Sequence, residues 1–341
     1  MKKAATMGSP RECHAAVLLR DGRVLVAGGQ DGSEQHVEAA EIWDPRTNRW
    51  SSAGRVPEGR VDHALVELAD GRVLLLGGFN DRGALRETLF WDPETRVFRA
   101  GPTLQEERCR AAAVVLRDGR VLVCGGRCPR GFMQFTDVWD PRTGAFTEGC
   151  DMTCERFSHA LAPLEDGRLF VVGGRNGEGA LRTAEVWDPK IERWTATDPL
   201  PETRRSHTAS ALPDGRVLVV GGWDDVGNGP LDSAMLWDPA TGRWREAGRL
   251  AHARFSHRAV VLDDGSVAIF GGSGERETLA RVERWNPLRG RWEEVNPMTL
   301  SRYNHTATRM PDGRVLLAGG FSQDRGEVVD TSEVWALGAS S

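Results

Sequence analysis

Short apolar runs, five or six residues long, recur along the whole chain between polar turns. In the first unit, His14 to Leu19 and Val24 to Gly28 are mostly apolar and β-branched, and runs of this length are too short for buried helices. A Gly-Gly pair closes the second run of each unit, and successive pairs are 49, 48, 48, 48, 50 and 48 residues apart. A period in this range indicates an array of similar units. The seven pairs are Gly28-Gly29, Gly77-Gly78, Gly125-Gly126, Gly173-Gly174, Gly221-Gly222, Gly271-Gly272 and Gly319-Gly320.

Each unit contains four predicted strands. An Asp-Gly pair such as Asp21-Gly22 separates the first two runs in all seven units, and it predicts a hairpin with a two-residue turn. A third run ends in Trp and is followed by Asp-Pro in most units, and the fourth run opens with an aromatic residue. Because Pro ends strand pairing and the Gly or Asn that follows accepts a left-handed turn position, these runs form a second hairpin. Each unit is therefore a four-stranded antiparallel meander.

Eleven of the 12 tryptophans occupy two repeat positions. Seven end the third strand and four open the fourth strand, where Phe98 and Phe146 stand in two other units. A buried Trp removes about 150–250 Å² from water, so we expect these side chains to form the core between neighbouring sheets. The glycine pairs, which have no Cβ, let the second strand end against the backbone of the next sheet.

Stacked radially, such sheets form a propeller. The combination of R-x-x-H before the first strand, Gly-Gly after the second, Asp-Pro after the third and an aromatic in the fourth resembles the Kelch repeat, in its bacterial type, over the whole chain. The resemblance implies an all-β fold, a seven-bladed β-propeller of four-stranded antiparallel blades. We expect one domain spanning residues 1–341, with repeats that start near Arg11, Arg60, Arg108, Arg156, Arg204, Arg254 and Arg302.

The seventh unit lacks its fourth strand. It stops at Trp335-Ala336-Leu337-Gly338 without Asp-Pro or a following run. Counting back ten residues from Arg60 reaches Trp50, the start of a fourth strand, and the same count from Arg11 reaches Met1. We therefore predict that residues 2–6 supply the outer strand of the last blade.

Composition restricts the choice of partners. The 341 residues include 40% hydrophobic and 27% charged residues, with a net charge of -5, which argues against a general nucleic-acid binder. No apolar stretch approaches the roughly 18 residues of a membrane span, and the start MKKAATMGSP has no apolar signal region. We expect a cytoplasmic monomer with no membrane partner, although an export signal removed earlier would leave no trace. Six Cys do not make a disulfide scaffold.

The loops between the second and third strands and the connections between units should emerge on one face, which carries the varied segments. The Kelch resemblance implies that partners bind there. Nine arginines of the inter-unit connections could form a positive ring for carboxylates, or they could pair with carboxylates and carbonyls inside the fold. They are Arg11, Arg60, Arg108, Arg110, Arg156, Arg204, Arg205, Arg254 and Arg302.

The third unit departs from the repeat. It has Ala111 where the others have His, and its loop RCPRGFMQFTD contains Phe132 and Phe135, which the other units lack. These two phenylalanines indicate a partner surface. Trp223 lies outside the two repeat positions and is equivalent to Phe79 and Phe321, so these aromatics either stack on a ligand or pack internally. The predicted ligand-binding face also includes Arg127, Arg175 and Tyr303.

Histidines and cysteines are the candidate metal ligands. Six histidines, each three residues after a repeat arginine, either make structural hydrogen bonds or serve as metal ligands or bases, but a ring of this size spreads its members apart. They are His14, His63, His159, His207, His257 and His305. Five cysteines surround the third unit, namely Cys109, Cys124, Cys128, Cys150 and Cys154. These cysteines could be packing thiols or the ligands of a zinc or copper(I) site, but their spacing matches no strong metal-binding template. We predict no cofactor.

Two functions remain in contention. The first is a scaffolding module that binds an acidic or amphipathic peptide or protein on the variable face. The second is a small-molecule enzyme, an isomerase, lyase or cyclase that uses Arg and His at the channel mouth, with or without a metal. Galactose oxidase builds a copper radical site with two tyrosines on a Kelch propeller, and because this chain has only Tyr303, that chemistry is disfavoured. The catalytic residues of any enzyme are not indicated by a contiguous motif.

Overall fold

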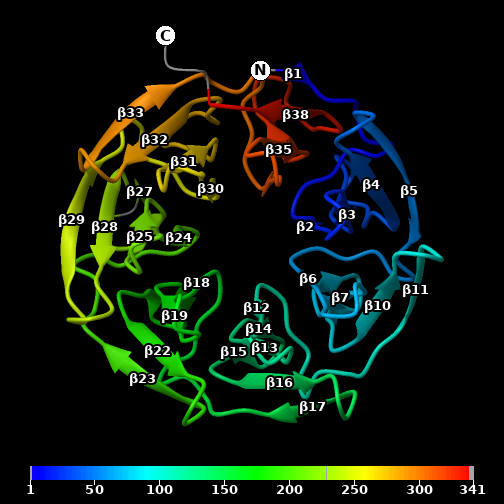
Figure 1. Cartoon of the computed structure of the whole chain (residues 1–341), viewed down its shortest axis with the longest axis horizontal. Helices are drawn as coiled ribbons and strands as arrows, with labels where there is room; N and C mark the ends of the chain where they lie inside the picture. Colours follow the sequence, from blue (N-terminus) through cyan, green and yellow to red (C-terminus); the bar gives the residue numbers. More distant parts are fainter. Residues whose placement is uncertain (1, 228, 338–341) are drawn as a thin grey trace.

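Seven four-stranded antiparallel sheets stand as blades around a central channel (Figure 1). The structure is a computed structural model that describes residues 2–227 and 229–337. The sequence prediction of an all-β, seven-bladed propeller is confirmed. No helix in the described part of the chain is long and apolar enough to cross a bilayer.

The blades follow one another in chain order, and each begins at the channel. Blade 1 comprises β2 (Ala15–Leu18), β3 (Val24–Ala27), β4 (Ala39–Asp44) and β5 (Arg49–Arg55); blade 2 comprises β6 (Ala64–Glu67), β7 (Val73–Leu76), β10 (Thr88–Asp92) and β11 (Val97–Ala100). Blade 3 comprises β12 (Ala112–Val115), β13 (Val121–Cys124), β16 (Thr136–Asp140) and β17 (Ala145–Glu148); blade 4 comprises β18 (Ala160–Pro163), β19 (Leu169–Val172), β22 (Ala184–Asp188) and β23 (Arg193–Thr197). Blade 5 comprises β24 (Thr208–Ala211), β25 (Val217–Val220), β28 (Ser233–Trp237) and β29 (Trp244–Arg249); blade 6 comprises β30 (Arg258–Val261), β31 (Val267–Phe270), β32 (Val282–Asn286) and β33 (Arg291–Val295). Blade 7 comprises β34 (Thr306–Arg309), β35 (Val315–Ala318), β38 (Ser332–Trp335) and β1 (Lys2–Lys3).

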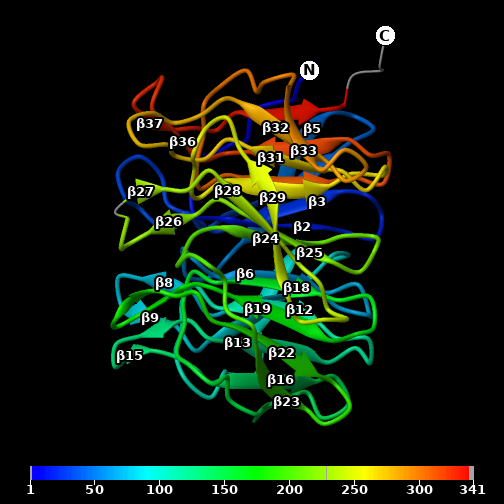
Figure 2. The same cartoon turned by 90° about the vertical axis from the view of Figure 1, so that its left-hand side faces the viewer.

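Five blades carry a small hairpin between their second and third strands. The hairpins are β8 (Phe79–Asn80) with β9 (Gly83–Ala84), β14 (Arg127–Cys128) with β15 (Gly131–Phe132), β20 (Arg175–Asn176) with β21 (Gly179–Ala180), β26 (Trp223–Asp224) with β27 (Gly229–Pro230), and β36 (Phe321–Ser322) with β37 (Glu327–Val328). Isolated bridges join them to the connections between blades, as between Cys109 and Arg127. Figure 2 shows hairpins from several blades on the same side of the ring. Loops and connections therefore share one face, which we call the loop face.

The core lies between the blades. Every residue of the second strand in all seven blades is buried, and seven apolar clusters each join two neighbouring blades. The Trp that ends the third strand is at most 2% exposed in every blade. It stands directly opposite the aromatic of the fourth strand, as in the pairs Trp187 with Trp194 and Trp91 with Phe98. The predicted role of these tryptophans in the core is thus explained by the sheet register.

The Gly-Gly pairs fasten each blade to the next. A Cβ on Gly173 would lie 2.5 Å from His207 Cε1 and 2.6 Å from Arg204 O of the following blade, so only glycine fits. The second glycine, Gly174, donates its N–H to Arg204 O at 2.9 Å. The equivalent bond is present at all seven junctions, which explains why the pair recurs without exception.

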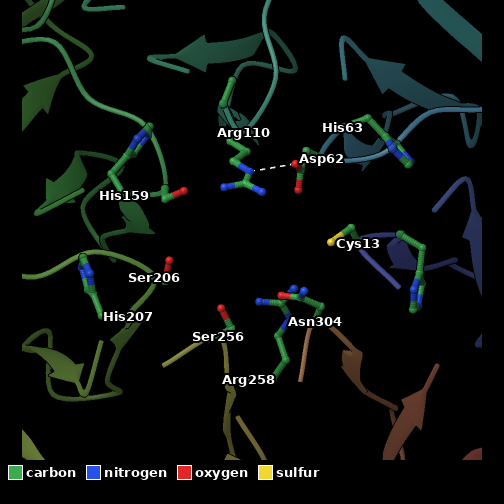
Figure 3. A pocket seen from close by; sticks show the side chains of 13 residues that line it. Cys13, Asp62, His63, Arg110, His159, Ser206, His207, Ser256, Arg258 and Asn304 are labelled. Carbon is green, nitrogen blue, oxygen red and sulfur yellow. Dashed lines mark hydrogen bonds and ion pairs between the residues drawn. The ribbon is translucent and has the colours of Figure 1, made fainter. Parts of the chain in front are cut away.

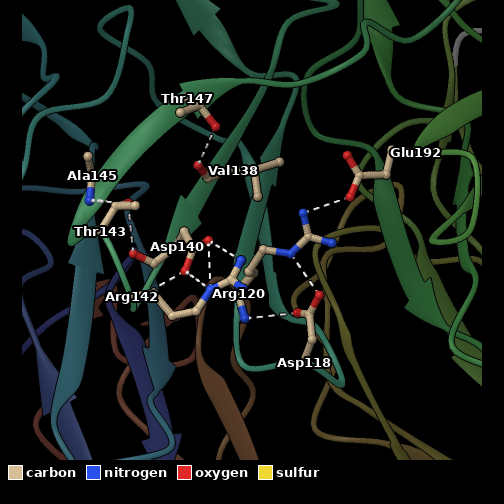
Figure 4. A network of polar contacts seen from close by, with 9 residues as sticks. All are labelled: Asp118, Arg120, Val138, Asp140, Arg142, Thr143, Ala145, Thr147 and Glu192. Atoms are coloured by element: carbon tan, nitrogen blue, oxygen red, sulfur yellow. Dashed lines mark hydrogen bonds and ion pairs between the residues drawn. The ribbon is translucent and has the colours of Figure 1, made fainter.

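The hairpin turns differ from the sequence prediction. In blade 1, Leu19 N donates to Arg23 O and Gly22 N donates to Leu19 O, both at 2.8 Å. The loop therefore has three residues rather than two, and Gly22 alone takes a positive φ, of 82°. The Asp side chain caps this loop and pairs with the Arg that follows, as Asp118 does with Arg120 at 2.7 Å (Figure 4). These turns lie at the opposite strand ends from the loop face.

The ring closes through its two ends. β1 pairs antiparallel with β38, with Lys2 opposite Val334 and Lys3 opposite Glu333. Ala4 N then donates to Ser332 O at 3.2 Å, and Trp50 Nε1 of blade 1 donates to Ala5 O at 2.9 Å. The predicted closure by the N-terminal strand is confirmed.

Candidate binding face

The seven repeat arginines are part of the fold rather than of its surface. Each is 0–1% exposed, and each donates through Nη1 to the carbonyl of the first glycine of its own Gly-Gly pair. Arg156, for example, binds Gly173 O at 2.7 Å, Thr183 O at 3.2 Å and Glu185 Oε1 at 2.6 Å. The hypothesis of a guanidinium ring open to a ligand is therefore wrong for Arg11, Arg60, Arg108, Arg156, Arg204, Arg254 and Arg302.

Most of these arginines have a buried carboxylate partner on the third strand. The pairs are Arg11 with Glu41, Arg108 with Asp137, Arg156 with Glu185, Arg254 with Glu283 and Arg302 with Glu333. Arg60 instead binds only backbone carbonyls, including Gly77 O at 3.0 Å, and burial lowers its pKa to about 10. This difference allows the contribution of the carboxylate to be tested.

The six repeat histidines lie at the junctions between blades. His14 Nε2 is 3.0 Å from Thr306 Oγ1 and His257 Nε2 is 3.0 Å from Thr208 Oγ1, each in the preceding blade. Burial lowers the pKa of all six, to about 3 for His63 and His159. They are therefore neutral at pH 7. His14 and His257 thus make the hydrogen bonds of the structural alternative, whereas the ring nitrogens of His63, His207 and His305 are buried without a hydrogen-bond partner among the described residues.

The residue two positions after each repeat arginine faces the channel. All seven have a φ between 51° and 55°, a left-handed conformation that is uncommon for residues other than glycine. All seven line a central cavity of about 310 Å³, seen in Figure 3. They are Cys13, Asp62, Arg110, Ser158, Ser206, Ser256 and Asn304.

A ring of backbone hydrogen bonds holds this conformation. A channel residue typically donates its N–H to the carbonyl of its counterpart in the preceding blade, as Arg110 N does to Asp62 O at 2.9 Å. The same bond occurs at six of the seven junctions within the described residues, and the exception lies between Arg110 and Ser158. The ring of backbone hydrogen bonds is therefore interrupted after blade 3, the blade that has Ala111 in place of the repeat histidine.

The charges at the channel mouth are unevenly placed. Blades 4 to 6 contribute three serines, whereas Asp62 and Arg110 form an ion pair of 2.7 Å on the opposite side. Arg258, at the start of β30, lines the same cavity, and its Nε donates to His305 O at 2.8 Å. No carboxylate of the described chain lies within 4 Å of its guanidinium, and burial lowers its pKa. Arg258 is thus a cation in the channel without an acidic partner.

A second cavity, of about 410 Å³, lies beside the channel between blades 2, 3 and 4. Asp62 and Arg110 line both cavities, and Arg127 lines the second. Together the two linings hold three arginines and one carboxylate, while four histidines with lowered pKa add no charge. The linings of the two cavities therefore carry two net positive formal charges, although the chain as a whole carries -5. Glu12, whose Oε2 accepts from Asn304 Nδ2 at 3.0 Å, lies behind this lining.

The other predicted face residues separate into exposed and packed groups. Phe79 and Phe135 are 44% and 40% exposed. Phe132 instead stacks on Phe157, with ring centroids 5.2 Å apart, and Tyr303 packs against Phe321 at 5.6 Å. Arg175 and Arg205 both pair with Asp225, and Arg205 lies over the ring of Trp223.

The six cysteines are free thiols. Cys109 and Cys128 line the second cavity on the loop face. Burial raises the pKa of Cys109 to about 11 and that of Cys124 to about 12. Across the described residues, no group of three or more His, Cys, Asp or Glu side chains is arranged to hold a metal ion.

Of the seven channel residues, sequence reasoning named only Arg110 as part of the binding face. Arg258 carried a usable signal, because the equivalent position holds only Ala or Thr in the other six repeats. Asp62 was overlooked although it stands one repeat period, 48 residues, before Arg110, so that opposite charges occupy the same repeat position in neighbouring blades. Phe157 was also missed, since nothing in the repeat pattern distinguishes it.

Comparison with known proteins agrees with this architecture. A family model described as the KLHDC2/KLHL20/DRC7 Kelch-repeats domain matches residues 145–320, and a second, described as the Kelch motif, matches residues 13–57. The first match covers just over half of the chain. No curated protein matches the chain significantly.

Proposed function

Because this chain belongs to the Kelch-repeat family of β-propellers, whose members commonly serve as protein-interaction scaffolds, we propose that it binds an acidic peptide segment of a protein partner at the mouth of its channel. The observation that carries the proposal is the charge of the two joined cavities, with three arginines against one carboxylate. Guanidinium groups bind carboxylates in bidentate geometry, and a positive cleft also speeds the encounter with an acidic partner.

The three arginines differ in how available they are. Arg127 is exposed and has no ion pair among the described residues. Arg110 shares its charge with Asp62 but keeps 48% of its side chain exposed. Arg258 lies deeper and is bound only through Nε, so the rest of its guanidinium faces the channel. An incoming carboxylate would therefore meet one cation at the rim and a second inside.

A peptide library displayed on phage tests this proposal with the purified full chain. We expect the selected peptides to be enriched in Asp and Glu, and the Arg110→Ala, Arg258→Ala double variant to lose that enrichment. For a synthetic selected peptide, the double variant should raise Kd at least about tenfold, since a hydrogen bond to a charged group contributes about 1.5–3 kcal/mol.

The matched control removes the same charge from the other face. Arg46 and Arg142 lie on the turns and are 84% and 83% exposed, so the Arg46→Ala, Arg142→Ala variant should select and bind as the wild type does. Selected peptides without acidic residues, or an equal loss in both double variants, would show that the mouth is not an acidic-peptide site.

A further inference from the structure

The second cavity, which we call the side pocket, has a different chemistry from the channel. It lies between the β8–β9 hairpin of blade 2 and the β14–β15 hairpin of blade 3, and it is lined by aromatic, small and apolar groups as well as the two arginines. The central cavity is lined instead by serines, histidines and charged side chains. Two neighbouring cavities of the loop face therefore suit two different parts of one ligand.

Two phenylalanines form the apolar walls of the side pocket. Phe79 is 44% exposed, more than any other aromatic side chain in the described part of the chain. Phe157, only 7% exposed, forms the opposite wall. Phe132 stacks on Phe157 with an interplanar angle of 13°, which explains why blade 3 alone has Phe at this position: it supports the pocket wall. An exposed aromatic beside a rigid aromatic wall is typical of an anchor site for an apolar side chain.

The side pocket and the channel share the Asp62–Arg110 pair as a common wall. Arg110 and Arg127 therefore border the apolar surface directly. A group that enters the pocket places its neighbours within reach of these cations. An extended peptide advances about 3.3 Å per residue, so an acidic side chain two or three residues away can reach Arg110 or the channel.

Blade 3 concentrates its departures from the repeat at the same place. Ala111 replaces the junction histidine, and the backbone bond between Arg110 and Ser158 is missing from the ring. Phe132, Cys109 and Cys128 are also departures, and all three contact or line the pocket. These features bring the apolar and the charged parts of the loop face together.

We infer that the side pocket is an anchor site for one aliphatic or aromatic side chain of a linear peptide that carries an acidic residue two or three positions away. This inference rests on the proposed function and adds the apolar half of the ligand. The occupant is a peptide of that chemistry because an acidic peptide alone leaves Phe79 exposed, while an apolar ligand alone leaves Arg127 and Arg258 without an anion and Arg110 with only Asp62.

Substitution of Ala84 tests the pocket without touching the arginines. Ala84 lines the pocket opposite Phe79 in the β8–β9 pair, so the indole of Ala84→Trp would fill the pocket. Ala180 has the equivalent place opposite Arg175 in the blade 4 hairpin, lines neither cavity and has the same intermediate exposure. Ala180→Trp is therefore the matched control, and Ala84→Leu is a second, smaller filling.

The experiment repeats the phage selection on these variants, with thermal unfolding as the check of folding. Wild type and Ala180→Trp should select peptides with an apolar residue two or three positions from an acidic one. Ala84→Trp should keep the acidic preference, lose the apolar one and raise the Kd of the wild-type peptide at least tenfold, with Ala84→Leu between them. Changing the peptide's apolar residue to Ala should cost little further affinity for Ala84→Trp.

The outcomes separate the two proposals. If Ala84→Trp binds as tightly as Ala180→Trp while the Arg110→Ala, Arg258→Ala variant still loses binding, the anchor pocket is wrong and the acidic site stands. If the selected peptides contain acidic but no apolar preference, the anchor pocket is likewise wrong. If binding is unaffected by loss of the two arginines, the proposed function itself is wrong.

Discussion

Two layers of side chains lie on the same short connections between blades, and they differ in every physical respect. The buried layer consists of the repeat arginines and histidines, which are held by carbonyls, carboxylates and hydroxyls of the fold. The mouth layer consists of the channel residues, two positions after each repeat arginine, together with Arg258. These side chains border the central cavity. An arginine such as Arg156 is thus buried and bonded to its own blade. Arg110, on the preceding connection, remains half exposed. The comparison shows that position along the connection, rather than residue type, decides whether an arginine is structural or available.

Acid should affect the buried layer most strongly. His63 and His159 have a pKa of about 3 in the folded protein because of burial, against 6.5 in the unfolded chain. The unfolded chain therefore binds more protons between pH 6.5 and 3, so the free energy of unfolding is complete above pH 6.5 and falls as the pH falls through this window. Between pH 7 and pH 5 each of these histidines should cost about 2 kcal/mol. Urea unfolding at pH 7, 6 and 5 measures the change, and the other four histidines add to it.

A single histidine can be isolated in the same experiment. His159→Leu should reduce the slope of the unfolding free energy against pH, near pH 5, by about 1.4 kcal/mol per pH unit. An unfolding free energy that stays constant between pH 7 and 5 would show that the buried histidines do not control stability.

Removing a repeat arginine should have the next largest effect. Arg156→Leu leaves Glu185 buried without its cation, so we expect a loss of about 3–5 kcal/mol in urea unfolding at pH 7.5. Arg60→Leu is the matched comparison because Arg60 binds only carbonyls. Its loss should be smaller, about 1–3 kcal/mol. Equal losses would mean that the buried carboxylate adds nothing to the role of the arginine.

The mouth layer should contribute least to stability. Arg110→Ala removes a partly exposed ion pair, which is typically worth at most about 1 kcal/mol. Arg258→Ala should leave the unfolding free energy within about 1 kcal/mol of the wild type or raise it slightly, because it removes a cation whose pKa is lowered by burial. A loss above about 2 kcal/mol in either variant would place that arginine in the buried layer instead.

The repeat pattern predicted the blades well because the residues that determine each blade lie within one unit. Gly173-Gly174 closes a strand, Trp187 fills the junction, and both recur at fixed spacing. The turn was misjudged because Asp-Gly suits both two- and three-residue loops, and only the hydrogen bonds of Leu19 distinguish them. The direction of Arg156 stayed open in the sequence because a left-handed residue follows it, at Ser158, and decides which side chain meets the channel. The pair of Asp62 with Arg110 joins the same position of two neighbouring repeats, which one repeat taken by itself does not reveal.

The closure of blade 7 has a consequence for biosynthesis. β1 precedes its partner β38 by about 330 residues in the chain, so β38 is synthesised roughly 20–60 s later at ordinary elongation rates. Until then the nascent chain carries an unpaired strand at one end and a growing stack of blades with an open edge at the other. Such edges are sites of wrong pairing. Pairing of β38 with β1 thus removes both edges at once, so chains cut short before β38 should aggregate rather than persist as shorter rings.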